Sequence, residues 1–168
     1  MGSRKGQIFS TDLTIAMLVL LAILVSFLVL WSAGTNRIAY FESERWREEA
    51  ARFAVESLVE TAGYPTHWEQ IDNLSDTNIR SLGLARSRNV LNPDKVQKFV
   101  SIQNTQYDFM KRVLGVQRYD LRVLITDLDG NELHSFKSAP PSDKVVTTVS
   151  RLALLNETMV VVRVYVWE

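Results

Sequence analysis

A run of 24 residues without a charged side chain, from Leu13 to Asn36, constrains the fold of this chain more than any other feature. As an α-helix that rises about 1.5 Å per residue, the run would extend roughly 36 Å, more than the ~30 Å hydrocarbon thickness of a bilayer. Thirteen of the nineteen residues from Leu13 to Trp31 are Leu, Ile, Val or Phe, the side chains that favour membrane insertion. The sequence therefore predicts a transmembrane helix.

The apolar run has two possible fates, removal as a secretory signal or retention as an anchor. A secretory signal has only about 7 to 15 apolar residues, followed by a small-x-small cleavage site. The nearest candidate site, Ser32-Ala33-Gly34, is followed by more helix-forming sequence. We therefore expect the helix to be retained, with removal of the whole segment as the alternative.

Basic residues flank the run on both sides, so the positive-inside rule does not decide its orientation by counting. Arg4 and Lys5 precede it, whereas Arg37, Arg45 and Arg47 follow it and are interleaved with glutamates. The part that follows has the pattern of a folded domain. We favour an N-terminus in the cytoplasm and a C-terminal domain outside the cell membrane.

The remaining composition indicates one ordinary packed domain. The chain has 19 basic and 19 acidic side chains, so no nucleic-acid surface is indicated. It has no cysteine, which excludes disulfide bonds, thiolate metal sites and a cysteine nucleophile. About 130 residues follow the membrane segment, enough to bury one small core.

The helix is predicted to continue beyond the membrane segment. The stretch from Arg37 to Ala62 contains no Pro or Gly and is rich in Ala, Glu and Arg. Gly63 and Pro65 supply the stop, so we expect one helix from about Phe9 to Ala62. Residues at three- and four-residue spacings predict one apolar face: Trp46, Ala50, Phe53, Ser57, Leu58 and Thr61.

A second helix is predicted after the polar stretch from Asp72 to Asn92, which we expect to be mostly irregular. Asn92-Pro93-Asp94 supplies a helix cap, a first-turn proline and an acid favoured by the helix dipole, and Gly115 supplies the stop. One apolar stripe runs between them: Val96, Phe99, Val100, Gln103, Tyr107, Met110 and Leu114.

The C-terminal third predicts a β-sheet. Apolar and polar residues alternate from Tyr119 to Thr126, and Asp129-Gly130 follows as a hairpin turn. Two further β-rich runs, Val145 to Leu155 and Met159 to Trp167, are separated by Asn156-Glu157. The predicted fold class is therefore α+β, with a long N-terminal helix packed on a small head that has a four-stranded antiparallel sheet.

Few residue patterns indicate chemistry. His67 and His134, the two histidines, lack the spacing of a zinc motif. The positions Asp127, Asp129 and Asn131 are similar to the start of a calcium loop, but the glycine and the twelfth-position glutamate that such a loop requires are missing, so they predict a turn. No phosphate-binding loop or nucleophile motif is present. We predict no enzyme activity, no catalytic or metal residues and no cofactor.

Two triplets have the pattern of N-glycosylation acceptors, Asn73-Leu74-Ser75 and Asn156-Glu157-Thr158. Either asparagine is a candidate if the domain faces outward. The second triplet also lies in a predicted turn.

At the start of the chain two basic residues, Arg4 and Lys5, precede Gly6-Gln7, a few polar residues and the retained apolar helix. This pattern resembles the class III signal peptide of archaeal type IV pilin-like proteins. In that family a membrane peptidase cuts on the cytoplasmic side after the small residue. The resemblance implies cleavage between Gly6 and Gln7, with Arg4 and Lys5 recognised by a prepilin peptidase.

The resemblance extends to the head, because pilins join a long N-terminal helix to a β-sheet domain. The segments AGYPTHWE, GLARSRNVLNPDKV and SRLALLNETMVVVRVYVW are similar to the heads of uncharacterised archaeal proteins of this kind. Bacterial type IV pilins carry a glutamate five residues into the mature chain, where this chain has Thr11 with Asp12 next to it. These two residues are candidates for a contact with the amino terminus of a neighbouring subunit.

The resemblance therefore implies a pilin or minor pseudopilin of an archaeal type IV pilus-like surface filament. Its parts would be a leader (1–6), a transmembrane and filament-core helix (7–36) and an extracellular α+β head (37–168). Its partners would be the peptidase, the membrane and other subunits through the N-terminal helix. The alternative is an unprocessed single-pass surface protein whose outer domain binds a partner.

Overall fold

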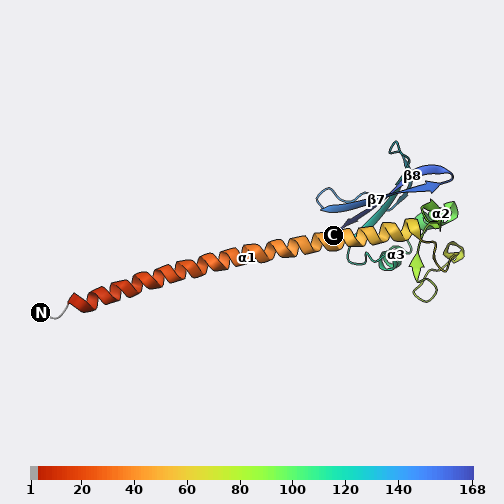
Figure 1. Cartoon of the computed structure of the whole chain (residues 1–168). Helices are drawn as coiled ribbons and strands as arrows, with labels where there is room; N and C mark the ends of the chain where they lie inside the picture. The colour runs from red at the N-terminus through yellow and green to blue at the C-terminus, as the bar shows by residue number, and fades with distance from the viewer. Residues whose placement is uncertain (1–3) are drawn as a thin grey trace. The chain divides into compact units, whose positions relative to one another are not determined.

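The computed structural model of the protein describes the backbone of residues 4–168 and the side chains of residues 12–32 and 43–168. The fold is α+β with an N-terminal apolar helix, which confirms this part of the prediction (Figure 1). The chain divides into two compact units, Met1–Ser43 and Glu44–Glu168, and each is described by itself.

The first helix, α1 (Arg4–Glu60), has 57 residues and confirms the predicted continuation beyond the apolar run. It ends two residues before the predicted end at Ala62. Gly63 follows with a φ of +80°, a left-handed conformation that glycine adopts without strain, so the predicted stop is the observed one.

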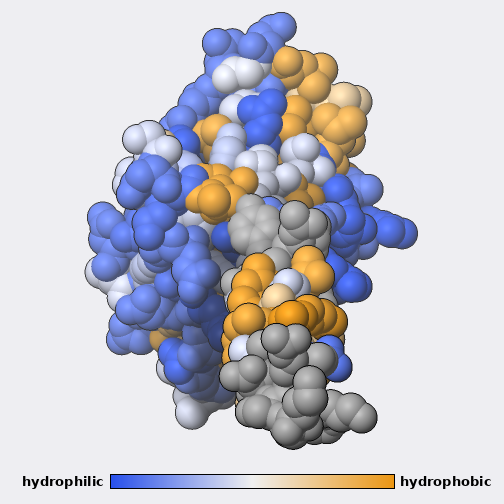
Figure 2. All heavy atoms as spheres, turned by 90° about the vertical axis from the view of Figure 1, so that its left-hand side faces the viewer, coloured by the Kyte–Doolittle hydropathy of each residue, from blue (hydrophilic) through white to orange (hydrophobic). Residues whose placement is uncertain are grey.

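In the first unit, the 21 residues Asp12–Ser32 of α1 are long and apolar enough to cross a membrane. At about 1.5 Å per residue they extend roughly 32 Å. None of this span is buried, and Leu30 has 73% of its surface exposed. The described side chains of the span form a hydrophobic, orange surface in Figure 2.

In the second unit, α1 packs on the head through a face that the sequence did not single out. The buried residues are Arg47, Ala51, Ala54, Val55, Leu58 and Val59. The prediction was right for Leu58 but wrong for Trp46 and Phe53, whose surfaces are 59% and 58% exposed. The buried face lies about one residue further along the helix, where four small or β-branched side chains allow close packing.

The predicted four-stranded antiparallel sheet is not what the structure contains, because the sheet has six strands and is mixed. The order is β3-β4-β7-β8-β5-β6, and β4 pairs with β7 in parallel. The predicted regions form β5 (Asp120–Thr126), β6 (Glu132–Phe136), β7 (Val146–Leu155) and β8 (Thr158–Trp167). The two added strands are β3 (Ala85–Ser87) and β4 (Val90–Leu91).

These added strands belong to the stretch that we expected to be mostly irregular. They are two and three residues long, too short to show an alternating pattern, and a backbone hydrogen bond from Leu154 N to Asn89 O (2.8 Å) joins their loop to β7. The same stretch contains β2 (Ser81–Leu82), which pairs with β1 (Gly63–Tyr64) in a two-stranded sheet. A short 3₁₀ helix, η1 (Trp68–Gln70), lies between β1 and β2.

The predicted second helix is divided into α2 (Pro93–Ser101) and α3 (Tyr107–Val113). Its start is confirmed, since Asn92 Oδ1 accepts a hydrogen bond from Asp94 N at 2.9 Å. The prediction of one continuous helix was wrong between 102 and 106. There Gln103, the polar member of the predicted stripe, accepts a hydrogen bond from Lys137 N at 2.7 Å and holds the interhelical turn against the end of β6.

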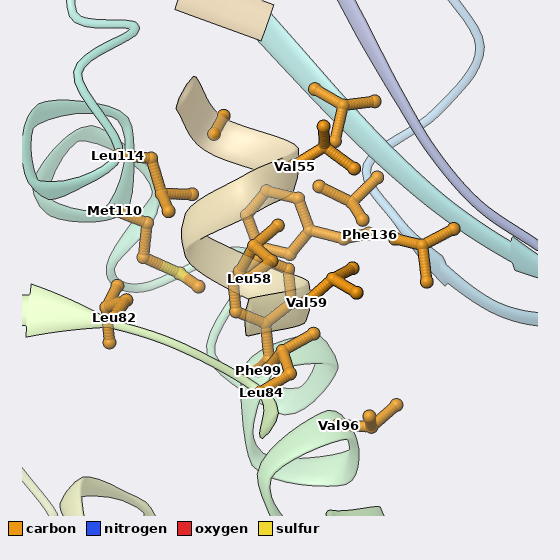
Figure 3. Close-up of a cluster of buried hydrophobic side chains, with 14 of the residues drawn as sticks. Val55, Leu58, Val59, Leu82, Leu84, Val96, Phe99, Met110, Leu114 and Phe136 are labelled. Carbon is orange, nitrogen blue, oxygen red and sulfur yellow. The ribbon is translucent and has the colours of Figure 1, made fainter. Parts of the chain in front are cut away.

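The core lies between α1, the sheet and the two short helices. In Figure 3, Val55, Leu58 and Val59 of α1 lie among Met110 of α3, Leu114 directly after it, Phe99 of α2 and Phe136 of β6. One face of the last strand, β8, carries four fully buried valines: Val160, Val162, Val164 and Val166. The rings of Phe99 and Phe136 lie 4.5 Å apart between centroids.

Candidate membrane and assembly segment

The candidate processing site lies at the start of α1. The backbone of Arg4, Lys5, Gly6 and Gln7 is helical, and their side chains lie outside the described residues, as does that of Thr11. Asp12 is the first described side chain and is exposed. The roles predicted for these residues therefore stay predictions.

The apolar span after Asp12 has the chemistry that lipid requires. The backbone polar groups in the interior of a helix are paired within the helix. Ser26 Oγ donates a hydrogen bond to Ala22 O at 2.8 Å, so its hydroxyl proton is also paired. The rings of Phe27 and Trp31 lie 5.9 Å apart between centroids. The exposed surface of the span is thus mainly hydrocarbon, suited to lipid or to the apolar surface of another helix.

The calcium-like pattern is a hairpin turn, as predicted. Asp127 accepts hydrogen bonds from Asn131 N at 2.8 Å and from Asn131 Nδ2 at 2.7 Å, so both carboxylate oxygens close the turn between β5 and β6. The side-chain hydrogen bond from Asn131 is the main cause that holds the pKa of Asp127 below its usual value.

The two histidines do not form a metal site with acidic neighbours. His67 Nδ1 lies 3.5 Å from Glu69 Oε1, and His134 lies on β6 opposite Ile125. Among the described residues there is no group of three or more His, Asp or Glu side chains able to hold a metal ion.

Two further titratable groups have shifted pKa values: Lys95, which the sequence analysis did not name, and Tyr107, which it named only as part of an apolar stripe. Lys95 is 2% exposed, and its Nζ donates to Ala62 O at 2.7 Å, just beyond the last turn of α1. Burial lowers the pKa of Lys95, and the nearby charge of Glu69 opposes this effect. The amphipathic pattern around Asn92 gives no signal for an inward lysine, so only the structure reveals this contact.

Tyr107 is the second of these groups. Its hydroxyl accepts a hydrogen bond from Leu121 N at 2.8 Å, and burial raises the pKa of Tyr107 to about 12. Lys137 Nζ lies 4.4 Å from the centroid of its ring. The tyrosine joins α3 to β5, which is a structural role.

Both candidate glycosylation residues are exposed. Asn73 lies in the loop between η1 and β2. Asn156 and Glu157 have φ values of 51° and 65° and form the two-residue turn between β7 and β8. Because a primed hairpin turn favours asparagine at its first position, the turn alone accounts for Asn156, whereas no such conformational demand accounts for Asn73.

These observations define a class of structure: an α+β head whose first helix is continuous in sequence with an apolar segment of bilayer length. No protein-family model, curated protein or solved structure matches the chain.

Proposed function

We propose that the chain is a structural subunit, a pilin or minor pseudopilin, of an archaeal type IV pilus-like surface filament. A prepilin peptidase removes residues 1–6, and the apolar part of α1 then joins the helices of other subunits. The head faces outward from the cell membrane and later from the filament.

The observation that carries the proposal is the exposed apolar span of α1. No part of Asp12–Ser32 is buried, and the same helix continues without interruption up to Glu60. The same helix supplies Val55, Leu58 and Val59 to the core of the head. An apolar surface of this size is stable only in lipid or against other apolar helices.

Processing has an electrostatic reason. With the leader, Arg4 and Lys5 stay beside the apolar span, and drawing either cation through hydrocarbon costs on the order of 2.5 to 3.5 kcal/mol or more. Cleavage after Gly6 removes both cations and leaves 17 basic and 19 acidic side chains. The trimmed helix leaves the bilayer more easily and is buried again among other helices.

Intact mass of the protein purified from its native membrane tests the proposal. We expect a chain that begins at Gln7, and we expect Gly6→Leu to retain residues 1–6. Gly2→Leu is the matched control, because it changes a glycine of the same leader away from the junction. A full-length native chain, or normal trimming of Gly6→Leu, would refute the proposal.

A second candidate is an unprocessed single-pass surface protein with a binding head. It is favoured by an apolar patch on the sheet, where Leu152 pairs with Val161 and Leu154 with Met159 across β7 and β8. Leu152, Leu154 and Met159 are 57%, 39% and 47% exposed. An uncut native N-terminus together with a partner bound at this patch would support the second candidate instead.

A further inference from the structure

The second unit has an uncovered aromatic groove. Trp46 and Phe53, both more than half exposed, lie two turns apart on α1 and face the loop that follows α3. Together with Tyr119 they line a groove of about 420 Å³. Gly115 leaves space in the groove beside Phe53. A side chain at this position would fill that space, because its Cβ atom would lie 3.2 Å from the ring of Phe53.

The rim of the groove is mainly positive. Arg112, Arg118 and Glu49 contribute its charged side chains. Arg112 forms an ion pair with Asp76 at 3.2 Å, whereas Arg118 has no ion pair within the described part of the chain. The groove is therefore suited to an apolar side chain that is accompanied by a carboxylate.

The turn between β5 and β6 presents such a pair. Leu128 is 63% exposed, and Asp129 beside it is exposed and has no ion pair among the described residues. The two hydrogen bonds between Asp127 and Asn131 close the turn and restrict its motion. In Figure 1 the turn projects from the sheet, away from α3.

The groove and the turn cannot meet within one chain. Tyr119 immediately precedes β5 and Asp127 immediately follows it, and the strand separates them by roughly 26 Å at about 3.3 Å per residue. A contact between different surfaces of two copies is heterologous, so a pair of copies retains one free groove and one free turn, and the contact can repeat.

We propose that Leu128 and Asp129 of one copy dock in the groove of the next copy, with Leu128 against Trp46 and Phe53 and Asp129 paired with Arg118. One leucine and one ion pair bury far less than the ~800 Å² per partner of a stable interface. This inference therefore rests on the proposed function, because copies held together by their α1 helices have the high effective concentration that a weak contact needs.

Cysteine cross-linking tests the contact directly, since the native chain has no cysteine. A full-length chain that carries both Gln117→Cys, at the exposed rim, and Leu128→Cys is oxidised in its membrane or filament. We expect a ladder of dimers, trimers and higher products. Chains that carry Gln117→Cys with Leu152→Cys are the matched control, because Leu152 is similarly exposed on another part of the head.

Charge exchange supplies a test that leaves Leu128 in place in the groove. The readout here is chemical coupling between lysines of neighbouring heads instead of disulfide formation. We expect Arg118→Glu and Asp129→Arg each to lower this coupling about two- to fivefold, the range of an exposed ion pair. The combined variant should restore it. Arg86→Glu, exposed on β3, is the control for net charge and should change nothing.

Each outcome decides the proposal. Any of three results overturns it. Dimers from the Leu128→Cys single variant would indicate a two-fold contact, and cross-linked products from only the Leu152→Cys control would identify the sheet patch as the contact. The absence of any cross-linked product would show that no such contact forms. If the native chain begins at Gln7 and forms polymers without the ladder, the proposed function stands and this inference fails. If the chain is untrimmed but forms the ladder, the contact stands and the filament role fails.

Discussion

Gly83→Ala is expected to destabilise the head more than any other exchange of a glycine for alanine. Gly83 lies between β2 and β3, where the chain crosses the end of α1. A Cβ atom at this position would lie 2.0 Å from Thr61 O and 2.4 Å from Thr61 Oγ1. Because Thr61 O belongs to the backbone, a change in the rotamer of the Thr61 side chain cannot relieve the overlap.

The size of the effect follows from the hydrogen bonds around Gly83. Leu84 N donates to Leu58 O at 2.8 Å, Ala85 N donates to Thr61 O at 3.0 Å, and Trp68 Nε1 donates to Gly83 O at 2.8 Å. Overpacking costs roughly 1–3 kcal/mol, and two weakened hydrogen bonds add about 1 kcal/mol each. We expect a loss of about 3–5 kcal/mol, which lowers Tm by roughly 10 °C or more.

Thermal unfolding of the full-length chain in detergent, followed by near-UV circular dichroism, to which the buried Trp68 and Trp167 contribute, measures this loss. Gly130→Ala is the matched control. Its added Cβ meets nothing within 4 Å, so only its φ of +91° opposes the substitution, at a cost of about 1 kcal/mol. If Gly83→Ala is no more destabilising than Gly130→Ala, the assigned close approach between this segment and α1 is wrong.

Three further predictions concern the head. Lys95→Met should lower stability by about 1–3 kcal/mol in thermal unfolding, because Ala62 O loses its buried donor; an unchanged Tm would contradict the contact. Burial raises the pKa of Tyr107 from 10 to about 12, so the stabilising effect of the protonated hydroxyl is complete below pH 10 and is lost as the pH rises through 12. The fall in Tm over this range should therefore be smaller in Tyr107→Phe than in the native chain. An identical fall in both proteins would refute the assignment. Glu157→Gly should raise stability by about 0.5–1 kcal/mol, since Glu157 has a φ of 65° that glycine adopts without strain; a lower Tm would show that the turn differs.

The packing face of α1 illustrates what the sequence leaves open. Two stripes one residue apart satisfy the helical spacing, one through Trp46 and Phe53 and the other through Ala51 and Ala54. The first stripe has the large aromatic side chains, but the head covers the second. Only the packed sheet and short helices decide between them, because small side chains allow the close approach that buries Val55 and Val59.

The short elements illustrate a second limit. β3 and β4 have three and two residues, and they exist through backbone pairing with each other and with the parallel neighbour β7. The break between α2 and α3 depends on Gln103, whose amide oxygen binds Lys137 N from a segment 34 residues away. Such long-range backbone contacts leave no periodic pattern in the sequence.

The sequence by itself determined the apolar span, the continuation of α1 to its glycine stop, the asparagine cap of α2 and the two long hairpins. Each of these depends on neighbouring residues, through hydrophobic periodicity, propensity or turn conformation. Only the tertiary structure decided the six-stranded sheet, the parallel pairing of β4 with β7, the inward Lys95 and the groove beside Trp46 and Phe53. These features depend on which distant surfaces meet, and that is set by the packing of the whole head.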